Sequence, residues 1–220
     1  MKKLIIFGSG DIAELAHYYF SHDSDYSVEG FTVDRDFMTE EQFCGLPVVP
    51  FDSIEKRFPA SEYALFIALS YSKLNNLRKE KYLAAKQLGY ELASYLSSHA
   101  TILNDGRIGD NCFILEDNTI QPFVTIGNNV TLWSGNHIGH HSTIKDHVFI
   151  ASQVVVSGGV EIGEQCFIGV NATLRDHIVI GPKSVIGAAA LLLADAAAEG
   201  VYIGETTERS RVPSTKLRKI

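Results

Sequence analysis

The second half of the chain carries an aliphatic residue at every sixth position, sixteen times in succession. This period fits neither an α-helix, which repeats every 3.6 residues, nor a half-buried strand, which alternates every second residue. It fits short strands joined by tight turns, and hexapeptide repeats of this kind are typical of a parallel β-helix. If three strands close one triangular coil, a coil takes about 18 residues and the repeat makes about five coils. The aliphatic positions are Ile102, Ile108, Ile114, Ile120, Ile126, Leu132, Ile138, Ile144, Ile150, Val156, Ile162, Ile168, Leu174, Ile180, Ile186 and Leu192.

A coil of this length assigns residues to columns that run along the axis of the β-helix. Cys112 and Cys166 fall in one inward column, at a position that is small or β-branched in most other repeats. The chain has one further cysteine and no CxxC spacing, which argues against a disulfide framework and a thiolate zinc site, so we interpret both as core residues. Asn118 and Asn136 also stand one coil apart at inward positions, which predicts a stacked asparagine ladder.

Residues 1–97 have a different pattern, in which apolar runs alternate with helix-like stretches. Alternating strands and helices predict a parallel sheet covered by helices. We expect, in chain order, a strand over Lys3–Phe7, a helix that runs through Tyr19, a strand over Ser27–Val33, a strand over Ala64–Leu69 and a polar helix from about Lys73 to Leu88.

The first expected strand is followed by the glycine turn Gly8-Ser9-Gly10-Asp11-Ile12-Ala13, which opens a helix. Such a turn leaves backbone N–H groups free at a helix N-terminus, where a phosphate can bind. Asp34 follows the second expected strand, at a spacing that suits hydrogen bonds to a ribose or a base edge. The turn, the helix and the acid together predict a nucleotide site. Because the domain is short for a dinucleotide, we expect a single nucleotide.

Charge and hydropathy limit the partners of the chain. The net charge of −7 argues against a nucleic-acid partner. No apolar run approaches the roughly 20 residues that span a bilayer, and the apolar run near Met1 is too short for a signal peptide, so we expect a cytoplasmic protein with no membrane partner. The chain ends in a basic tail, which is either a solvated end or a patch for a phosphorylated ligand such as CoA. Its basic residues are Arg209, Arg211, Lys216, Arg218 and Lys219.

Histidines gather in one coil of the repeat, at His137, His140 and His141. Gly158 and Gly159 stand one coil beyond the last two, so we expect a histidine pair to face a glycine pair across the roughly 5 Å between neighbouring strands. Transfer of an acetyl group from CoA to an amine needs a base for the amine and a donor for the oxyanion. A histidine suits the first task and the N–H of Gly158 the second, with no covalent acyl-enzyme.

Several parts of the chain resemble the bacterial hexapeptide-repeat acyltransferases, a group that includes sialic acid O-acetyltransferases and UDP-linked 4-amino-sugar N-acetyltransferases. The parts that carry the resemblance are Gly8–Ala13, Asp34, Ser98–Ile102, Ile138–Ile144, Ser157–Val160 and Gly200–Gly204. The resemblance extends over essentially the whole chain. The resemblance implies an α/β Rossmann-like nucleotide-binding domain over residues 1–97, a left-handed parallel β-helix over residues 98–205 and a basic tail over residues 206–220.

The resemblance also implies an activity and a set of site residues. It implies a homotrimer that transfers an acetyl group from acetyl-CoA to the amino group of a nucleotide-linked sugar in bacterial surface glycan biosynthesis, with active sites between neighbouring β-helices and no metal. His140 falls on the catalytic base of the family, and Gly158 on the amide that contacts the thioester carbonyl. Val170 and Ala188, one coil apart, fall on positions that line the pantetheine channel of CoA. The nucleotide half of the substrate would contact Gly8, Ser9, Gly10, Asp11, Asp34 and Arg35.

Three parts of the chain depart from the family pattern. The family often has an acid directly after the catalytic histidine, where this chain has His141. The base must therefore be oriented either by His141 in its neutral form or by an acid elsewhere. Ile12 stands where the glycine turn often carries a histidine, and Gly204–Glu208 replaces the common Gly-x-Pro-Ala-Lys ending. We expect these differences to affect the choice of sugar more than the reaction.

The residues leave other functions open. A sugar O-acetyltransferase has the same fold, and no residue separates an amine from a hydroxyl acceptor, or UDP from dTDP or GDP. A metal-dependent hydratase similar to γ-type carbonic anhydrases would use His137, His140 and His147 as zinc ligands, but the N-terminal domain and the ligand spacing argue against it. A non-catalytic nucleotide-sugar-binding protein would leave the column of histidine and glycine without a role.

Overall fold

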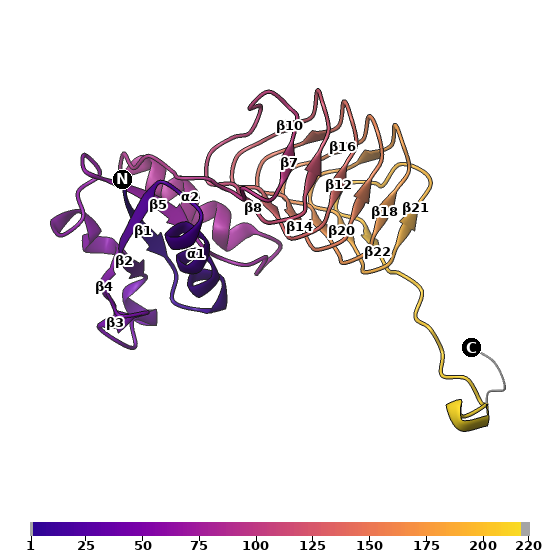
Figure 1. The fold of residues 1–220 in the computed structure, drawn as a ribbon, viewed down its shortest axis with the longest axis horizontal. Coiled ribbons are helices and arrows are strands. Elements are labelled where there is room, and N and C mark those ends of the chain that lie inside the picture. Colours follow the sequence, from indigo (N-terminus) through magenta and orange to yellow (C-terminus); the bar gives the residue numbers. More distant parts are fainter. Residues whose placement is uncertain (1, 217–220) are drawn as a thin grey trace.

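The computed structural model describes residues 2–216, which form an α/β domain, a parallel β-helix and an extended C-terminal segment (Figure 1). The α/β domain lies at the end where the β-helix begins, and the C-terminal segment leaves the last coil at the other end. In chain order, the elements of the α/β domain are β1 (Lys2–Phe7), α1 (Asp11–His22), β2 (Tyr26–Val33), η1 (Arg35–Phe37), β3 (Gln42–Phe43), β4 (Leu46–Pro50), η2 (Phe51–Lys56), β5 (Tyr63–Ile67) and α2 (Asn76–Gln87).

The α/β domain is built on a five-stranded sheet with the order β3-β4-β2-β1-β5. Strands β4, β2, β1 and β5 are parallel, and β3 pairs antiparallel with β4. The interior strand β1, between β2 and β5, is buried from Leu4 to Phe7, as expected of a parallel strand covered on both faces. From β1 the chain builds the sheet first towards β2 and then, on the other side, towards β5. The carboxyl ends of β1 and β5 therefore bound the crevice in which α/β sheets bind ligands.

The expected elements of the α/β domain are present, and two features differ. The strand pair β3–β4 was not predicted. Pro47 and Pro50 in β4 weaken the strand pattern of the sequence there. The polar helix α2 begins at Asn76 rather than near Lys73. Residues 73–75 adopt left-handed backbone conformations, with φ between 50° and 62°, and cannot join a right-handed helix.

The β-helix consists of two-residue strands that stack in three sheets, which we call its first, second and third faces. The first face holds β6 (Tyr95–Leu96), β8 (Phe113–Ile114), β11 (Thr131–Leu132), β14 (Phe149–Ile150), β17 (Phe167–Ile168), β20 (Val185–Ile186) and β22 (Val201–Tyr202). The second face holds β7 (Thr101–Ile102), β9 (Thr119–Ile120), β12 (His137–Ile138), β15 (Val155–Val156), β18 (Thr173–Leu174) and β21 (Leu191–Leu192). The third face holds β10 (Thr125–Ile126), β13 (Thr143–Ile144), β16 (Glu161–Ile162) and β19 (Val179–Ile180).

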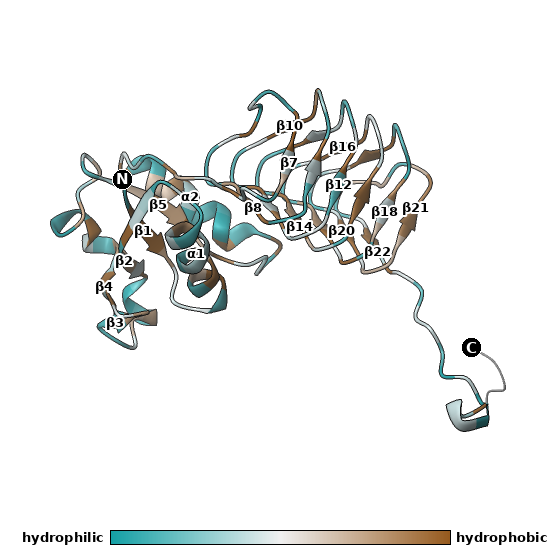
Figure 2. Cartoon of the chain, viewed as in Figure 1, coloured by the Kyte–Doolittle hydropathy of each residue, from teal (hydrophilic) through white to brown (hydrophobic). Residues whose placement is uncertain are grey.

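The structure confirms the period of six. Each coil passes through the first, second and third faces in turn, and paired strands such as β11 and β14 place Thr131 opposite Phe149 in the next coil. The strand-ending residues from Ile114 to Leu192 are buried in one continuous core. Figure 2 shows hydrophobic residues along β1 of the α/β sheet and along strands of the last coils such as β21. The repeat therefore forms a closed parallel β-helix around its aliphatic column.

The inward cysteines and asparagines occupy the positions that the columns predict. Cys112 and Cys166 are fully buried, and burial raises the pKa of the Cys166 thiol to about 11, as expected of a core residue. Asn136 Nδ2 donates to Asn118 Oδ1 at 3.0 Å, which confirms the asparagine ladder. Asn136 Oδ1 then accepts the backbone N–H of Val154 at 2.8 Å, so the ladder satisfies polar groups inside the β-helix.

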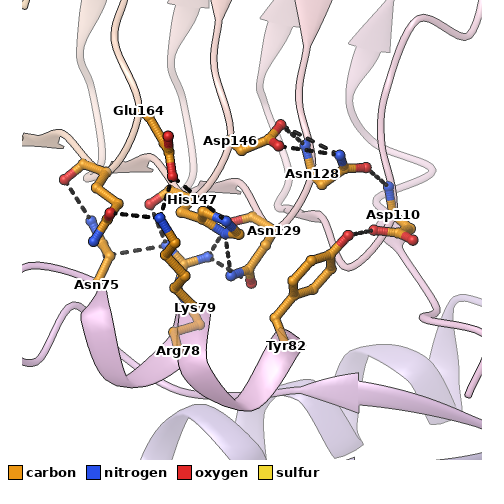
Figure 3. Close-up of polar contacts among 11 residues, drawn as sticks. Asn75, Arg78, Lys79, Tyr82, Asp110, Asn128, Asn129, Asp146, His147 and Glu164 are labelled. Carbon is orange, nitrogen blue, oxygen red and sulfur yellow. Dashed lines mark hydrogen bonds and ion pairs between the residues drawn. The ribbon is translucent and has the colours of Figure 1, made fainter. Parts of the chain in front are cut away.

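Helix α2 fixes the α/β domain against the edge between the third and first faces (Figure 3). Arg78 is buried there, and its guanidinium donates to the backbone carbonyls of Asn129, His147 and Val148 and to the side chain of Asn75. Among residues 2–216 no carboxylate pairs with Arg78, and burial lowers its pKa to about 10. A buried charge is costly unless its hydrogen bonds are made, so these carbonyls hold α2 in one position.

His147 belongs to the same contact between the helix and the β-helix. Its side chain is 5% exposed, and its Nδ1 lies 2.9 Å from Asn129 Nδ2. The ring of Tyr82 from α2 packs on His147 at a centroid distance of 5.4 Å, and the Tyr82 hydroxyl donates to Asp110 at 2.6 Å. Burial lowers the pKa of His147 to about 4, so the ring is neutral near pH 7.

The C-terminal segment is exposed from residue 205 onwards and ends, in the described part of the chain, with η3 (Ser214–Lys216). It includes Arg209 and Arg211 of the predicted basic tail, whereas Arg218 and Lys219 lie outside the described residues. None of the helices described here has the length and apolar character that a membrane crossing requires.

Candidate active site

His140 and His141 follow β12 on the edge between the second and third faces, where both are exposed. The ring of His140 lies against the backbone of Gly158 in the next coil. A Cβ atom built on Gly158 would stand only 2.6 Å from His140 Cε1 and 2.8 Å from Nε2. The column spacing predicts this pair. Gly159 differs from the prediction, since the ring of His177, one coil further on, covers it in place of His141.

The backbone N–H of Gly158 is a free donor. Within residues 2–216 it makes no hydrogen bond, whereas the N–H of Gly159 donates to the His140 carbonyl at 2.8 Å. An imidazole beside a free N–H offers a base and an oxyanion donor at one place.

Several contacts orient the two histidines. The backbone N–H of His140 donates to Gln121 Oε1 at 2.8 Å, and His140 Nδ1 lies 3.1 Å from His141 Nδ1. The ring of His141 packs on Phe123 in the preceding coil, with centroids 4.7 Å apart. With Nδ1 of His140 engaged by its neighbour, Nε2 is the ring nitrogen that can accept a proton from a ligand.

Val170 and Ala188 follow β17 and β20 on the edge between the first and second faces. Their turns stack, since the N–H of Ala189 donates to the Val170 carbonyl at 2.8 Å, and Val170 is 45% exposed. This edge of the triangular β-helix is not the edge that carries His140. Within one chain, the structure does not bring these residues together with His140.

An apolar hollow of about 380 Å³ lies between this edge and the α/β domain. Tyr71, on the loop after β5, packs on Phe149 and Phe167 in its wall, with ring centroids 5.0 and 4.7 Å apart. Ile12 brings the start of α1 into the same wall. Among residues 2–216, no charged side chain lines the hollow. The lining residues are Ile12, Tyr71, Trp133, Phe149, Ala151, Ser152, Phe167, Gly169, Val170 and Ala188.

The hollow was not foreseen from the sequence, although part of its signal was present. Phe149 and Phe167 stand one coil apart at outward strand positions, so column spacing alone could have marked an aromatic stripe. Tyr71 reaches the stripe through the fold of the chain, and no periodic pattern marks it.

The glycine turn has the geometry of an anion site. Gly8 has a φ of 129°, and a Cβ atom there would stand 2.8 Å from the carbonyl oxygen of Ala68, so the turn requires glycine. Ser9, Gly10 and Asp11 are exposed at the start of α1. In the described chain the N–H groups of Ser9 and Gly10 donate no hydrogen bond, which leaves them available at the N-terminus of the helix.

Asp34 and Arg35 lie after β2 beside this turn, and each has a partner. Asp34 Oδ1 accepts from Lys81 Nζ of α2 at 2.5 Å, and the Lys81 ammonium lies 5.6 Å from the ring centroid of Phe7. Arg35 donates to Asp52 through Nε at 2.9 Å and Nη2 at 2.7 Å. Asp34 Oδ2 has no donor in residues 2–216 and stays open to a ligand. Lys81 is a member of this site that the sequence did not reveal, because it comes from a helix 47 positions further along the chain.

The histidines proposed above as zinc ligands do not come together within the chain. His137 lies on the second face, and His147 lies on the edge between the third and first faces, where it contacts α2 rather than His140. Among residues 2–216, no group of three or more histidine, cysteine or acidic side chains could hold a metal ion.

Comparison with known proteins identifies the repeat and the fold. The family described as bacterial transferase hexapeptide (six repeats) matches residues 105–140, 124–158 and 141–176, all within the β-helix. A sequence search of curated proteins finds no match.

Solved structures match over nearly the whole chain. PerB from Caulobacter crescentus, in complex with CoA and GDP-perosamine, matches with a TM-score of 0.81 at 21% identity, over 93% of this chain and 95% of PerB. The acetyltransferase domain of PglB from Neisseria gonorrhoeae, in complex with acetyl coenzyme A, matches with a TM-score of 0.79 at 21% identity, over 89% of this chain and 93% of that domain. WeeI from Acinetobacter baumannii matches with a TM-score of 0.78 at 19% identity, over 93% of this chain and 97% of WeeI. The chain thus carries the hexapeptide repeats of bacterial transferases and has the fold of these proteins, an α/β domain followed by a parallel β-helix.

Proposed function

We propose that the protein transfers the acetyl group of acetyl-CoA to the amino group of a nucleotide-linked sugar. The observation that carries the proposal is the contact of His140 with Gly158, which joins a candidate base and a free N–H donor on an open edge of the β-helix. The fold supports the proposal, because PerB and the PglB domain share it and are described in complexes with CoA and GDP-perosamine and with acetyl coenzyme A.

The three predicted groups of residues give each ligand a place. The nucleotide binds at the glycine turn, where the N–H groups of Ser9 and Gly10 face its phosphates and Asp34 Oδ2 accepts from the ribose or the base. The pantetheine arm of acetyl-CoA lies along Val170 and Ala188. The sugar occupies the apolar hollow, since Ile12 joins the glycine turn to that hollow and the aromatic rings suit the C–H face of a sugar ring.

The proposed site needs a second copy of the chain. His140 and Val170 lie on different edges of one β-helix, so a single chain cannot bring the base to the thioester. In the proposal, the edge that carries His140 meets the edge that carries Val170 on a neighbouring copy. A closed homotrimer repeats this contact three times and gives three equivalent sites.

The proposed reaction is direct transfer. The lone pair of the neutral amine attacks the thioester carbonyl carbon, and the C=O π electrons move to the oxygen, where the Gly158 N–H stabilises the negative charge. His140 Nε2 takes the proton that the amine nitrogen loses. When the oxyanion collapses, the C–S bond breaks, and sulfur leaves with the electron pair and takes the proton from His140. The products are an N-acetylated sugar nucleotide and CoA with a free thiol.

The substrates of this reaction suggest its setting. An amino sugar that is acetylated while still linked to a nucleotide is ready for a glycosyltransferase. We therefore assign the proposed reaction to bacterial surface glycan biosynthesis, in the cytoplasm, where acetyl-CoA and nucleotide sugars are available.

A thiol-release assay with acetyl-CoA tests the proposal against UDP-, dTDP- and GDP-linked amino sugars and their hydroxyl counterparts. Release with an amino sugar alone supports N-acetyl transfer and identifies the nucleotide. Release with a hydroxyl sugar alone replaces it by O-acetyl transfer in the same fold. A protein that binds no acetyl-CoA and releases no thiol with any of these sugars refutes the proposed activity.

The variant His140→Ala tests the proposed base. We expect its kcat to fall by roughly 10²-fold or more, because general-base catalysis contributes about 10²- to 10⁴-fold, while its oligomeric state and CoA affinity stay unchanged. Full turnover in this variant would remove His140 from the chemistry.

A further inference from the structure

The histidine pair on the edge between the second and third faces contains a contact that the proposed function does not use. His140 Nδ1 and His141 Nδ1 are 3.1 Å apart. At this distance one nitrogen must carry a proton and the other must present a lone pair, since two bare nitrogens or two N–H groups would repel each other. The contact therefore has a direction, which decides what His140 can do.

Only one direction leaves His140 able to act as a base. If His141 donated the proton, the single proton of neutral His140 would sit on Nε2, which could then accept nothing from an amine. If His140 donates from Nδ1, its Nε2 carries a free lone pair. Nε2 is also close to Gly158, 2.8 Å from the position of a Cβ atom on that residue.

The position of His141 is fixed by the fold and by one aromatic contact. Its φ of 60° is the left-handed conformation that the equivalent turn residue adopts in neighbouring coils, among them Phe123 and His177. The ring of His141 packs on that of Phe123 at 4.7 Å, with an angle of 36° between the planes. The backbone and the ring on which it packs both restrict the direction of its Nδ1.

Within residues 2–216 of one copy, the surroundings of the pair supply no carboxylate that could replace His141 as the partner of His140. The preceding coil presents Gln121 and Phe123, and the next coil presents glycine backbone. Asp176 stands two coils beyond His140, roughly 10 Å along the axis, and His177 next to it lies on Gly159. Within residues 2–216, no ring nitrogen of the pair lies within 4.0 Å of a carboxylate oxygen.

We infer that His141 is a positioning residue, whose neutral ring accepts the Nδ1–H of His140 and thereby holds the His140 Nε2 lone pair beside the Gly158 amide. The inference rests on the proposed role of His140 as base. During the reaction the proton of the amine moves to His140 Nε2, and the Nδ1–H bond to His141 becomes charge-assisted and stronger. His141 neither gains nor loses a proton, and it touches no reacting atom.

A neutral partner has a consequence for the pH dependence of activity. A carboxylate in its place would stabilise the imidazolium form of His140 more strongly than an imidazole does. The protonated, inactive base would then persist to higher pH. With His141 as partner, we expect the acid limb of kcat/KM to lie at lower pH than in a variant with a carboxylate at this position.

Four variants test the role of His141, with wild-type thiol release as the reference. In His141→Ala we expect kcat to fall roughly 10- to 100-fold, less than for loss of the base itself, with the KM for acetyl-CoA unchanged. His141→Asn and His141→Glu each supply an acceptor and should restore most of the lost kcat. His141→Glu should also move the acid limb of kcat/KM upwards by about one pH unit, because an opposite charge now faces His140. His177→Ala is the matched control, since its ring lies on the same column but faces Gly159, and we expect wild-type rates and pH profile.

Three results would overturn the inference. His141→Ala with wild-type kcat would show that His140 needs no partner at Nδ1. Equal losses in His141→Ala and His177→Ala would assign both effects to packing of the edge. An acid limb that does not move in an active His141→Glu variant would show that the two side chains do not interact during turnover. If wild-type protein releases no thiol with any acceptor, the proposed function itself has failed, and this outcome is separate from the three.

Discussion

The contact between His140 and Gly158 makes one substitution informative. Alanine at 158 keeps the backbone N–H and adds a single methyl group, which would stand 2.6 Å from His140 Cε1 and 2.8 Å from Nε2. Real Cβ atoms essentially never approach a heavy atom within 3.0 Å, and ordinary contact begins at 3.4 Å. The His140 ring must therefore retreat by about 0.8 Å, while the oxyanion donor stays where it is.

The size of this displacement sets the expected loss. A misplacement of about 1 Å in a catalytic group can cost on the order of 10²-fold in rate. We therefore expect kcat of Gly158→Ala to fall between about 10- and 100-fold, which corresponds to roughly 1.4 to 2.7 kcal/mol of barrier. Because the ring moves within an exposed edge, the free energy of unfolding should change little.

Thiol-release kinetics with acetyl-CoA and the identified acceptor measure this effect, with Gly159→Ala as the matched control. The added methyl group of Gly159→Ala would meet the His177 ring rather than His140, and the φ of 69° at that position adds a stability cost of about 1 kcal/mol. We expect this control to keep its kcat within about threefold of the wild type, since the reacting groups are untouched. A folded Gly158→Ala protein with wild-type kcat would refute the assignment of His140 to the reacting centre.

Three further predictions concern the contacts of α2. The unfolded chain protonates His147 near pH 6.5, whereas the folded chain does so only near pH 4, so stability present above pH 6.5 is lost as the pH falls towards 4. Chemical denaturation across this range should show a loss of about 2 to 3 kcal/mol, which His147→Gln should largely remove. Arg78→Met leaves buried carbonyls without donors and should cost at least about 3 kcal/mol of unfolding free energy, and a wild-type melting temperature would contradict this. Lys81→Met leaves the Asp34 carboxylate without its ammonium partner next to a negatively charged nucleotide, and it should raise the KM for the sugar nucleotide by about tenfold with acetyl-CoA affinity unchanged. An unchanged KM would separate Lys81 from nucleotide binding.

The fold of the β-helix was predictable because its information is periodic. A spacing of six fixes which side chain of each strand points inward, and equal coils fix which residues stack. Those two facts are enough to place Cys112 and Cys166 in the core and His140 against Gly158. Column spacing does not say to which neighbouring coil a side chain turns. The sequence therefore could not show that His177, rather than His141, covers Gly159.

The contacts between the two domains were not predictable from local patterns. The Tyr71 ring packs on Phe149, and Arg78 donates to the carbonyl of His147. In both contacts, several strands of the chain lie between the two partners in sequence. A buried arginine on a polar helix looks like a solvated residue in the sequence, because its acceptors are backbone carbonyls that every residue carries. Lys81 is hidden in the same way, since it lies on α2, which follows β5, whereas its partner Asp34 follows β2 on the other side of β1.

The most direct test of the proposed reaction asks whether its site is shared between copies of the chain. His140→Ala removes the base from one edge, and Val170→Trp blocks the proposed CoA path on another, so each variant alone should be inactive. Co-expression of the two with different tags yields mixed oligomers, in which an intact site forms wherever His140 of one copy meets Val170 of the other.

Thiol release by the purified mixed oligomers is the measurement. In a trimer that contains both variants, one of the three contacts pairs His140 of one copy with Val170 of the next, so we expect about a third of the wild-type rate to be restored. Mixed oligomers as inactive as either parent would contradict a site built from His140 of one copy and the Val170 edge of its neighbour.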